Sequence, residues 1–249
     1  MGNQETQVAR LGIIGSKGRM GAALAQAIEE ARHSVSGGID QGGSPEELAA
    51  QSDCLIDFSA PVALAANLDA ARGAGIPILI GTTGLEAEHF AAIAASAGAH
   101  PVLQTGNTSL GVNLLAALVE TAAAKLGDDW DLEILEMHHK HKVDAPSGTA
   151  KLLGEAAARG RGIDLAANTD SGRDGMTGAR KQGDIGFAAL RGGSVAGDHS
   201  VILAGEQERI TLSHSAENRM IFARGAVKAA AWLIGKDAGR YTMADVLGL

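Results

Sequence analysis

Short apolar runs alternate with longer, alanine-rich segments through the first hundred residues of the chain. The runs predict strands at residues 8–14, 35–39, 54–58, 76–80 and 101–104. The segments between them have helical length and composition, at residues 20–31, 45–50, 61–74 and 85–97. Five strands that alternate with helices are typical of α/β proteins, so we predict a doubly wound parallel sheet.

The pattern changes near residue 109. Helices are predicted at 110–126, 147–158 and 222–234, strands at 132–138, 185–190, 200–204 and 208–213, and a long polar loop at 168–184. This order predicts an α+β unit with a mixed or mostly antiparallel sheet. We therefore expect a first domain over residues 1–108, completed by 220–249, and a second domain over 109–219. The junctions are expected at 106–111 and 216–225.

Composition and charge restrict the function. The 249 residues are 45% hydrophobic and 20% charged, which suits a globular protein with a buried core. The net charge of −8 argues against nucleic-acid or anionic-membrane partners, which require a basic face. Cys54 is the only cysteine, residues 1–10 carry no apolar signal segment, and no apolar run reaches the length of about 18–20 residues that a membrane span needs. We expect a cytoplasmic protein that acts on a small molecule.

A glycine-rich turn joins the first strand to the first helix. Gly15, Gly18 and Gly21 are spaced so that the backbone can approach a pyrophosphate at a helix N-terminus. Lys17 and Met20 replace the second and third glycines of the general dinucleotide fingerprint, so an ordinary tight turn is the alternative interpretation. The context still favours a Rossmann-like dinucleotide site. Its predicted contacts in this turn are Gly15, Ser16, Lys17, Gly18, Arg19 and Met20.

The end of the second strand bears on the choice of cofactor. Asp40 stands where an acidic residue usually binds the adenosine ribose, and Gln41 stands where an arginine would favour the 2′-phosphate of NADPH. NADH is therefore expected to bind. Lys17 and Arg19 are either solvated loop charges or a site for that phosphate, so the prediction is NADH and/or NADPH.

Loops after later strands are expected to complete the cofactor site, because ligands of open parallel sheets bind beyond the carboxyl ends of the strands. The residues concerned are Gly81, Thr82 and Thr83 after the fourth strand and Gly106, Asn107, Thr108 and Ser109 after the fifth. Phe58, at the end of the third strand, either borders the same crevice or packs in the core.

The densest group of chemically active side chains lies at residues 136–150. Its three histidines lack the helical spacing of a zinc site, and Lys140 and Lys142 would repel a cation, so no metal is predicted. The start of the following helix, Ser147, Gly148 and Thr149, offers backbone N–H groups to an anion, although Ser147 has the alternative role of an N-cap. Lys142 and His139 add positive charge and donors, and His138 is suited to donate a proton near neutral pH. We predict a catalytic, carboxylate-binding loop rather than a merely polar surface segment.

These residues carry a resemblance. The motif E-x-H-H-x-x-K-x-D-A-P-S-G-T-A at 136–150 is similar to that of the dihydrodipicolinate reductase family, also called 4-hydroxy-tetrahydrodipicolinate reductases. Further matches are G-x-x-G-R-M-G at 15–21, G-T-T-G at 81–84, N-x-S-x-G-V-N at 107–113, I-G-F at 185–187 and the segment 218–225.

The resemblance implies an NAD(P)H-dependent oxidoreductase that reduces a cyclic imine dicarboxylate to tetrahydrodipicolinate in diaminopimelate and lysine biosynthesis. It implies that His138 is the acid/base and Lys142 a proton donor and substrate anchor. Carboxylate binding by His139, Gly148 and Thr149 is also implied. Arg219 matches a family arginine near the substrate, with a surface ion pair as the alternative. The resemblance also implies a homotetramer, which members of the family usually form through the sheet of the second domain. Two other hypotheses remain open: another two-domain dehydrogenase of amino-acid metabolism, and a dinucleotide sensor without catalysis.

Overall fold

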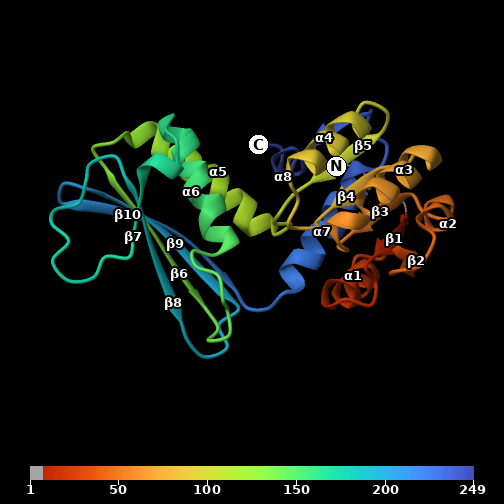
Figure 1. Cartoon of the computed structure of the whole chain (residues 1–249), viewed down its shortest axis with the longest axis horizontal. Coiled ribbons are helices and arrows are strands. Elements are labelled where there is room, and N and C mark those ends of the chain that lie inside the picture. The colour runs from red at the N-terminus through yellow and green to blue at the C-terminus, as the bar shows by residue number, and fades with distance from the viewer. Residues whose placement is uncertain (1–7) are drawn as a thin grey trace, which may run out of the picture. The chain divides into compact units, whose positions relative to one another are not determined.

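The computed structural model describes residues 8–249, so most of the polar N-terminal stretch considered above lies outside the described residues. The chain forms two compact units (Figure 1). One contains the chain up to Leu110 together with Met220–Leu249, and the other is Gly111–Arg219. Within residues 8–249, no helix combines the length and the apolar character that a membrane crossing requires.

The first unit is built on a six-stranded parallel sheet with the order β11-β5-β4-β3-β1-β2. Its strands are β1 (Arg10–Ile14), β2 (Ser34–Ile39), β3 (Cys54–Asp57), β4 (Ile78–Ile80), β5 (Pro101–Gln104) and β11 (Gly239–Tyr241). Its helices are α1 (Arg19–Glu30), α2 (Pro45–Ala50), α3 (Leu64–Ala74), α4 (Ala87–Ser96), α7 (Met220–Leu233) and α8 (Met243–Leu247). The strand order reverses at β1, and ligands of such sheets bind at this switch point.

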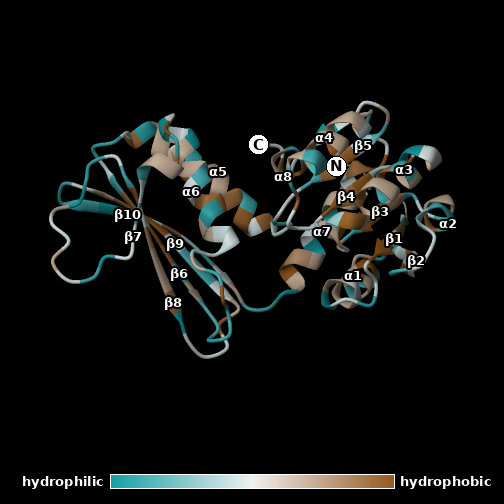
Figure 2. Cartoon of the chain, in the orientation of Figure 1, coloured by the Kyte–Doolittle hydropathy of each residue, from teal (hydrophilic) through white to brown (hydrophobic). Residues whose placement is uncertain are grey.

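Both faces of this sheet are buried, as the unbroken apolar strands require. Leu11 and Ile13 of β1 pack with helices α1 and α7, whereas Ile14 packs with α2, α3 and α4. Figure 2 shows the hydrophobic residues concentrated on the central strands of this unit. The predicted doubly wound sheet is therefore confirmed.

The second unit has a five-stranded mixed sheet with the order β10-β9-β6-β8-β7. Its elements are α5 (Leu110–Leu126), β6 (Asp131–His138), α6 (Gly148–Arg161), β7 (Thr169–Ser171), β8 (Ile185–Arg191), β9 (Gly197–Gly205) and β10 (Glu208–Ala216). β6 is antiparallel to β9 and parallel to β8. Every second residue of β6 is buried, so Glu136 and His138 share the face of Leu132 and Ile134, which packs against α5 and α6.

Three sequence predictions need correction. The expected loop 168–184 contains β7, and the sequence analysis missed β11 and α8. β7 and β11 have three residues each, and each is the edge strand of its own sheet. Neither therefore carries an apolar run that a pattern can detect. The helix expected at 61–74 opens with a 3₁₀ turn, Pro61–Ala63, before α3 begins.

Candidate active site

The first unit contains a cleft of about 660 Å³ beyond the carboxyl ends of β1, β2 and β3. Gly15 lies in this cleft with φ +87°, and a Cβ on it would lie 2.5 Å from the carbonyl oxygen of Phe58. A Cβ on Gly21 would lie 2.3 Å from the carbonyl oxygen of Ser16. Side chains are therefore excluded from this turn by close packing of the backbone, and the N-terminus of α1, capped by Gly18 without a side-chain bond, borders the cleft. These features fit a dinucleotide pyrophosphate.

Asp40 is fixed against the glycine turn. Its Oδ2 accepts hydrogen bonds from the Ser16 hydroxyl and from the Lys17 backbone N–H, both at 2.8 Å. Asp40 also lines the cleft, and the side chain of Lys17 is exposed. The turn and the predicted ribose-binding carboxylate thus form one rigid group.

Only part of the predicted cofactor set lines this cleft. Gly15, Gly18, Asp40 and Phe58 do so. The residues outside its lining are Ser16, Lys17, Arg19, Met20, Gly81, Thr82, Thr83, Gly106, Asn107, Thr108 and Ser109. Met20 packs on the hydrophobic core, and the Phe58 ring packs on Gly81, where a Cβ would lie 2.2 Å from it.

Two threonines of these loops form hydrogen bonds within the first unit. The hydroxyl of Thr108 is buried and donates to the carbonyl of Phe222 at 2.7 Å, which ties the β5–α5 loop to α7. Thr82 is buried and donates to the carboxylate of Asp57 at 3.1 Å. Contacts of these two side chains with a cofactor stay a prediction.

Sequence reasoning missed the role of Asp57. This carboxylate is fully buried at the end of β3 and accepts hydrogen bonds from Ser59, Asn67 and Thr82. It therefore holds the loops after β3 and β4. An acidic residue that ends an otherwise apolar strand was the available signal.

In the second unit, His138 and Glu136 form a pair at the end of β6. The Nδ1 of His138 lies 2.6 Å from Glu136 Oε2, and both side chains are buried. Because a carboxylate only accepts, Nδ1 carries the proton that the pair shares, and Nε2 is the nitrogen that remains for proton exchange. The ring faces the backbone of Gly197, where a Cβ would lie 3.0 Å from Nε2. The absence of a side chain at Gly197 thus leaves room beside this nitrogen.

Arg191, at the end of β8, clamps the same carboxylate. Its Nη1 and Nη2 donate to Glu136 Oε2 and Oε1, each at 2.8 Å, and Nη2 also donates to the carbonyl of Asp144 at 2.7 Å. Burial raises the pKa of Glu136, but the hydrogen bonds from Arg191 and His138 outweigh burial and hold the pKa below its ordinary value. Glu136 is therefore ionised at neutral pH. Sequence reasoning assigned no role to Arg191, which lies 53 residues after His138.

Ser147 serves as the N-cap of α6, the alternative that the sequence left open. Its hydroxyl oxygen accepts the backbone N–H of Ala150 at 3.1 Å and lies 3.0 Å from Nε2 of His199. The side chain is buried, so its hydroxyl is committed to the helix start. His199 stands edge-on to the His138 ring, with centroids 5.0 Å apart. Burial is the main reason that the pKa of His199 is lowered to about 4, so this histidine is neutral at physiological pH.

Positive groups gather around His139. Burial, followed by the charges of Arg219, His141, His138 and Lys142, lowers the pKa of His139. The Nζ of Lys142 forms an ion pair with Asp144 Oδ1 at 2.8 Å. Gly148 opens α6, is exposed, and has nothing within 4 Å of the position of a Cβ. The first turn of this helix, which includes Thr149, is therefore open to an anion at Gly148.

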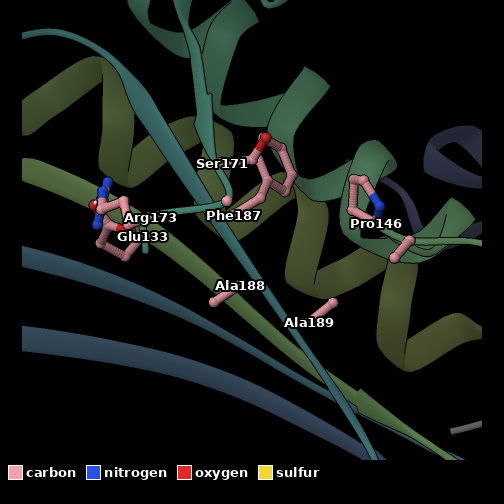
Figure 3. A pocket seen from close by; sticks show the side chains of 9 residues that line it. Glu133, Pro146, Ser171, Arg173, Phe187, Ala188 and Ala189 are labelled. Carbon is pink, nitrogen blue, oxygen red and sulfur yellow. Dashed lines mark hydrogen bonds and ion pairs between the residues drawn. The ribbon is translucent and has the colours of Figure 1, made fainter. Parts of the chain in front are cut away.

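A second pocket in this unit, of about 480 Å³, lies beside Ala145 and Pro146 (Figure 3). The charged side chains in its lining, Arg173 and Glu133, form an ion pair of 2.8 Å with each other. It lacks the excess positive charge of the His139 surroundings, so it is a poorer site for an anion. Within the described part of the chain, no group of three or more His, Cys, Asp or Glu side chains is arranged to hold a metal ion.

Comparisons with known proteins cover almost the whole chain. The family model described as dihydrodipicolinate reductase, N-terminus, matches residues 9–108, and that described as dihydrodipicolinate reductase, C-terminus, matches residues 111–247. The 4-hydroxy-tetrahydrodipicolinate reductase of Zymomonas mobilis subsp. mobilis is 56% identical over 247 residues, which cover 96% of this chain and 97% of the relative. The 4-hydroxy-tetrahydrodipicolinate reductase 1 of Mesorhizobium japonicum is 55% identical over 262 residues, which cover 95% and 96% of the two chains.

A solved structure shares the fold. Dipicolinate-bound dihydrodipicolinate reductase from Paenisporosarcina sp. TG-14 superposes with a TM-score of 0.74 over 96% of this chain and 98% of that one, at 20% identity. The sequence matches confirm the resemblance that the 136–150 motif indicated. The chain therefore belongs to the dihydrodipicolinate reductase family.

Proposed function

We propose that this chain is a 4-hydroxy-tetrahydrodipicolinate reductase, an NAD(P)H-dependent oxidoreductase that reduces a cyclic imine dicarboxylate in diaminopimelate and lysine biosynthesis. The observation that carries the proposal is the arrangement around His138. A histidine oriented by a buried carboxylate lies on the sheet next to the start of α6, and cationic groups surround the neighbouring His139. A dianionic ring needs such donors, and its reduction needs an acid.

Each residue in this unit has a distinct part in the proposed reaction. His138 presents Nε2 to the ring and supplies the proton that is added at the carbon next to the reduced one. Lys142 leaves Asp144 to bind a substrate carboxylate and serves as a further proton donor. His139, Arg219 and the backbone N–H groups at Gly148 and Thr149 bind the carboxylates. Ser147 contributes to this site as the N-cap that fixes the helix start.

The cofactor site is assigned to the first unit. The cleft with Gly15, Gly18 and Asp40 would hold the adenosine and pyrophosphate portions of the dinucleotide, which when bound supplies the hydride. The side chain of Asp40 favours NADH, and exposed Lys17 and Arg19 are available for the additional phosphate of NADPH. Thr83 and Gly106, which are exposed at the ends of their strands, remain the proposed contacts toward the nicotinamide.

We also propose a cytoplasmic homotetramer. The sheet of the second unit is covered by α5 and α6 on one face, and Leu190, on the opposite face, is 48% exposed. An apolar side chain on an uncovered sheet face favours contact with another copy. Sedimentation equilibrium at micromolar concentration tests this state, and a monomer there would contradict it.

Cofactor oxidation tests the proposed function. Absorbance of NADH or NADPH should fall when the condensation product of pyruvate and aspartate semialdehyde is added, and should not fall with simple keto acids. Turnover of an amino acid or an aldehyde in place of that product would favour the alternative hypothesis of a different two-domain dehydrogenase. Dinucleotide binding without any turnover would favour a sensor.

A further inference from the structure

The buried carboxylate of Glu136 has four hydrogen-bond donors around it. Arg191 supplies two, the backbone N–H of Ser147 donates to Oε1 at 3.1 Å, and Nδ1 of His138 lies beside Oε2 at 2.6 Å. The carboxylate end of these contacts is buried, since Glu136 is 1% exposed, whereas the side chain of Arg191 is 22% exposed. The side chain of Arg191 is joined to the His138 ring through this carboxylate, and its other hydrogen bonds go to the carbonyls of Leu190 and Asp144.

The charges in this group oppose each other. A carboxylate alone beside an imidazole favours the charged imidazolium and makes it a weak acid. A guanidinium on the same carboxylate cancels most of that effect, because the pair then presents almost no net charge to the ring. This cancellation of charge affects His138 strongly, since the buried carboxylate of Glu136 is little screened by water.

We propose that Arg191 is a positioning residue that neutralises the Glu136 carboxylate and thereby limits how strongly this carboxylate holds the proton of His138. The inference rests on the proposed function for its catalytic consequence, but the effect on His138 itself is a property of this unit alone. Arg191 also holds the catalytic loop through its bond to the carbonyl of Asp144.

Other titratable groups face the same ring. His199 approaches from β9 and is itself flanked by His214 and Asp198. His139 and Lys142 follow in the loop after β6. His199 is neutral above a pH of about 4, and none of these groups bonds to the Glu136 carboxylate in the described residues. Substitution of Arg191 or Glu136 therefore changes the charge at His138 and leaves these neighbours in place.

The test is the pH dependence of kcat/KM for the dicarboxylate at saturating NADH. Activity that needs protonated His138 declines on the alkaline side as this proton is lost. Arg191→Met leaves Glu136 unbalanced and should move this decline upward by about one pH unit. Glu136→Gln removes the negative charge and should move it downward by about one pH unit. The double variant has no charge at either position and should return to within about half a unit of the wild type.

Two further variants separate charge from structure. Arg191→Lys keeps the positive charge but loses the two parallel hydrogen bonds to Glu136. The pH of the alkaline decline in kcat/KM should therefore stay near that of the wild type, even if KM rises. Arg173→Met breaks the ion pair between Arg173 and Glu133, another glutamate of β6, and should leave the profile unchanged. If Arg191→Met does not fold because a buried charge is unpaired, Glu136→Gln and the neutral double variant still give the comparison.

Histidine NMR titration of the isotope-labelled protein without ligands gives a readout that needs no turnover, with the His138 signal assigned by its loss in His138→Asn. Opposite shifts in the two single variants, cancelling in the double variant, are expected. Shifts in the same direction, no shift, or no cancellation would overturn the inference. A wild-type protein that shows no turnover but the expected titrations would disprove the proposed function and leave the charge balance standing.

Discussion

His138 and Arg191 are directly paired residues of the parallel strands β6 and β8, and both bond to the one carboxylate of Glu136. The side chains lie on the same face of the sheet because Glu136 precedes His138 by two residues on β6. The acid proposed for the reaction is therefore oriented by two rigid strands rather than by its own loop, which is the arrangement that precise catalysis favours.

Replacement of His138 should affect the chemical step more than cofactor binding. We expect His138→Asn to lower kcat by about 100-fold or more, because a positioned general acid typically contributes that much. NADH affinity, measured by fluorescence titration, should stay within about twofold, since His138 lies in the second unit and the cofactor cleft in the first. The exposed neighbour His141→Asn is the matched control. Unchanged turnover in His138→Asn would remove it from the mechanism.

Loss of Lys142 should weaken substrate binding while the fold is retained. Its ion pair with Asp144 is partly exposed, so it contributes little to the free energy of unfolding. We expect Lys142→Met to raise the KM for the dicarboxylate by about 10- to 100-fold, the value of a charge-assisted hydrogen bond, and to lower kcat if Lys142 also donates a proton. Lys140→Met, at an exposed position in the same loop, should behave like the wild type. Steady-state kinetics with both variants gives the comparison, and equal effects would contradict a specific anchor.

Cofactor choice should depend on Asp40. Removal of its charge in Asp40→Asn is expected to weaken NADH by about tenfold and to reduce the preference for NADH over NADPH, because a 2′-phosphate no longer meets a carboxylate. The ratio of kcat/KM values for the two cofactors measures this preference. Asp69→Asn changes an exposed carboxylate on α3 and serves as the control. A ratio that is the same in Asp40→Asn and the wild type would place the ribose elsewhere.

Stability should fall in mild acid because of His199. Its pKa is about 4 in the folded protein and near its ordinary value of 6.5 in the unfolded chain. Between these values the unfolded chain binds a proton that the folded protein does not, so the free energy of unfolding decreases as pH drops from about 6.5 to about 4. The loss amounts to about 3 kcal/mol on the scale of 1.36 kcal/mol per pKa unit. Urea unfolding at a series of pH values measures it.

Two histidine variants test whether His199 causes this dependence of the free energy of unfolding on pH. His199→Gln keeps a hydrogen-bonding group near Ser147 and removes the titration, so the dependence on pH should flatten in this interval. His141→Gln changes an exposed histidine and should retain the wild-type slope. A slope that survives in His199→Gln would assign the acid sensitivity to other groups.

The secondary structure followed closely from local pattern. Helix α2 (Pro45–Ala50), strand β5 (Pro101–Gln104) and helix α5 (Leu110–Leu126) have the predicted bounds, because each has a clear apolar pattern and a proline, serine or glycine near its ends. The short strands β7 and β11 did not follow, because three residues at a sheet edge have too few buried positions to produce a pattern.

The site divides in the same way. Sequence alone indicated the two-part chain, the glycine turn, Asp40 as the proposed ribose ligand and the loop from Glu136 to Ala150, because each is encoded by neighbouring residues with fixed spacing. Only the tertiary structure decided that Arg191 and His199 meet this loop, that Ser147 is committed to the helix start and that Thr108 is buried against α7. These contacts depend on strand register and helix packing between segments far apart in the chain, and register is set by the buried face of the whole sheet rather than by any local pattern.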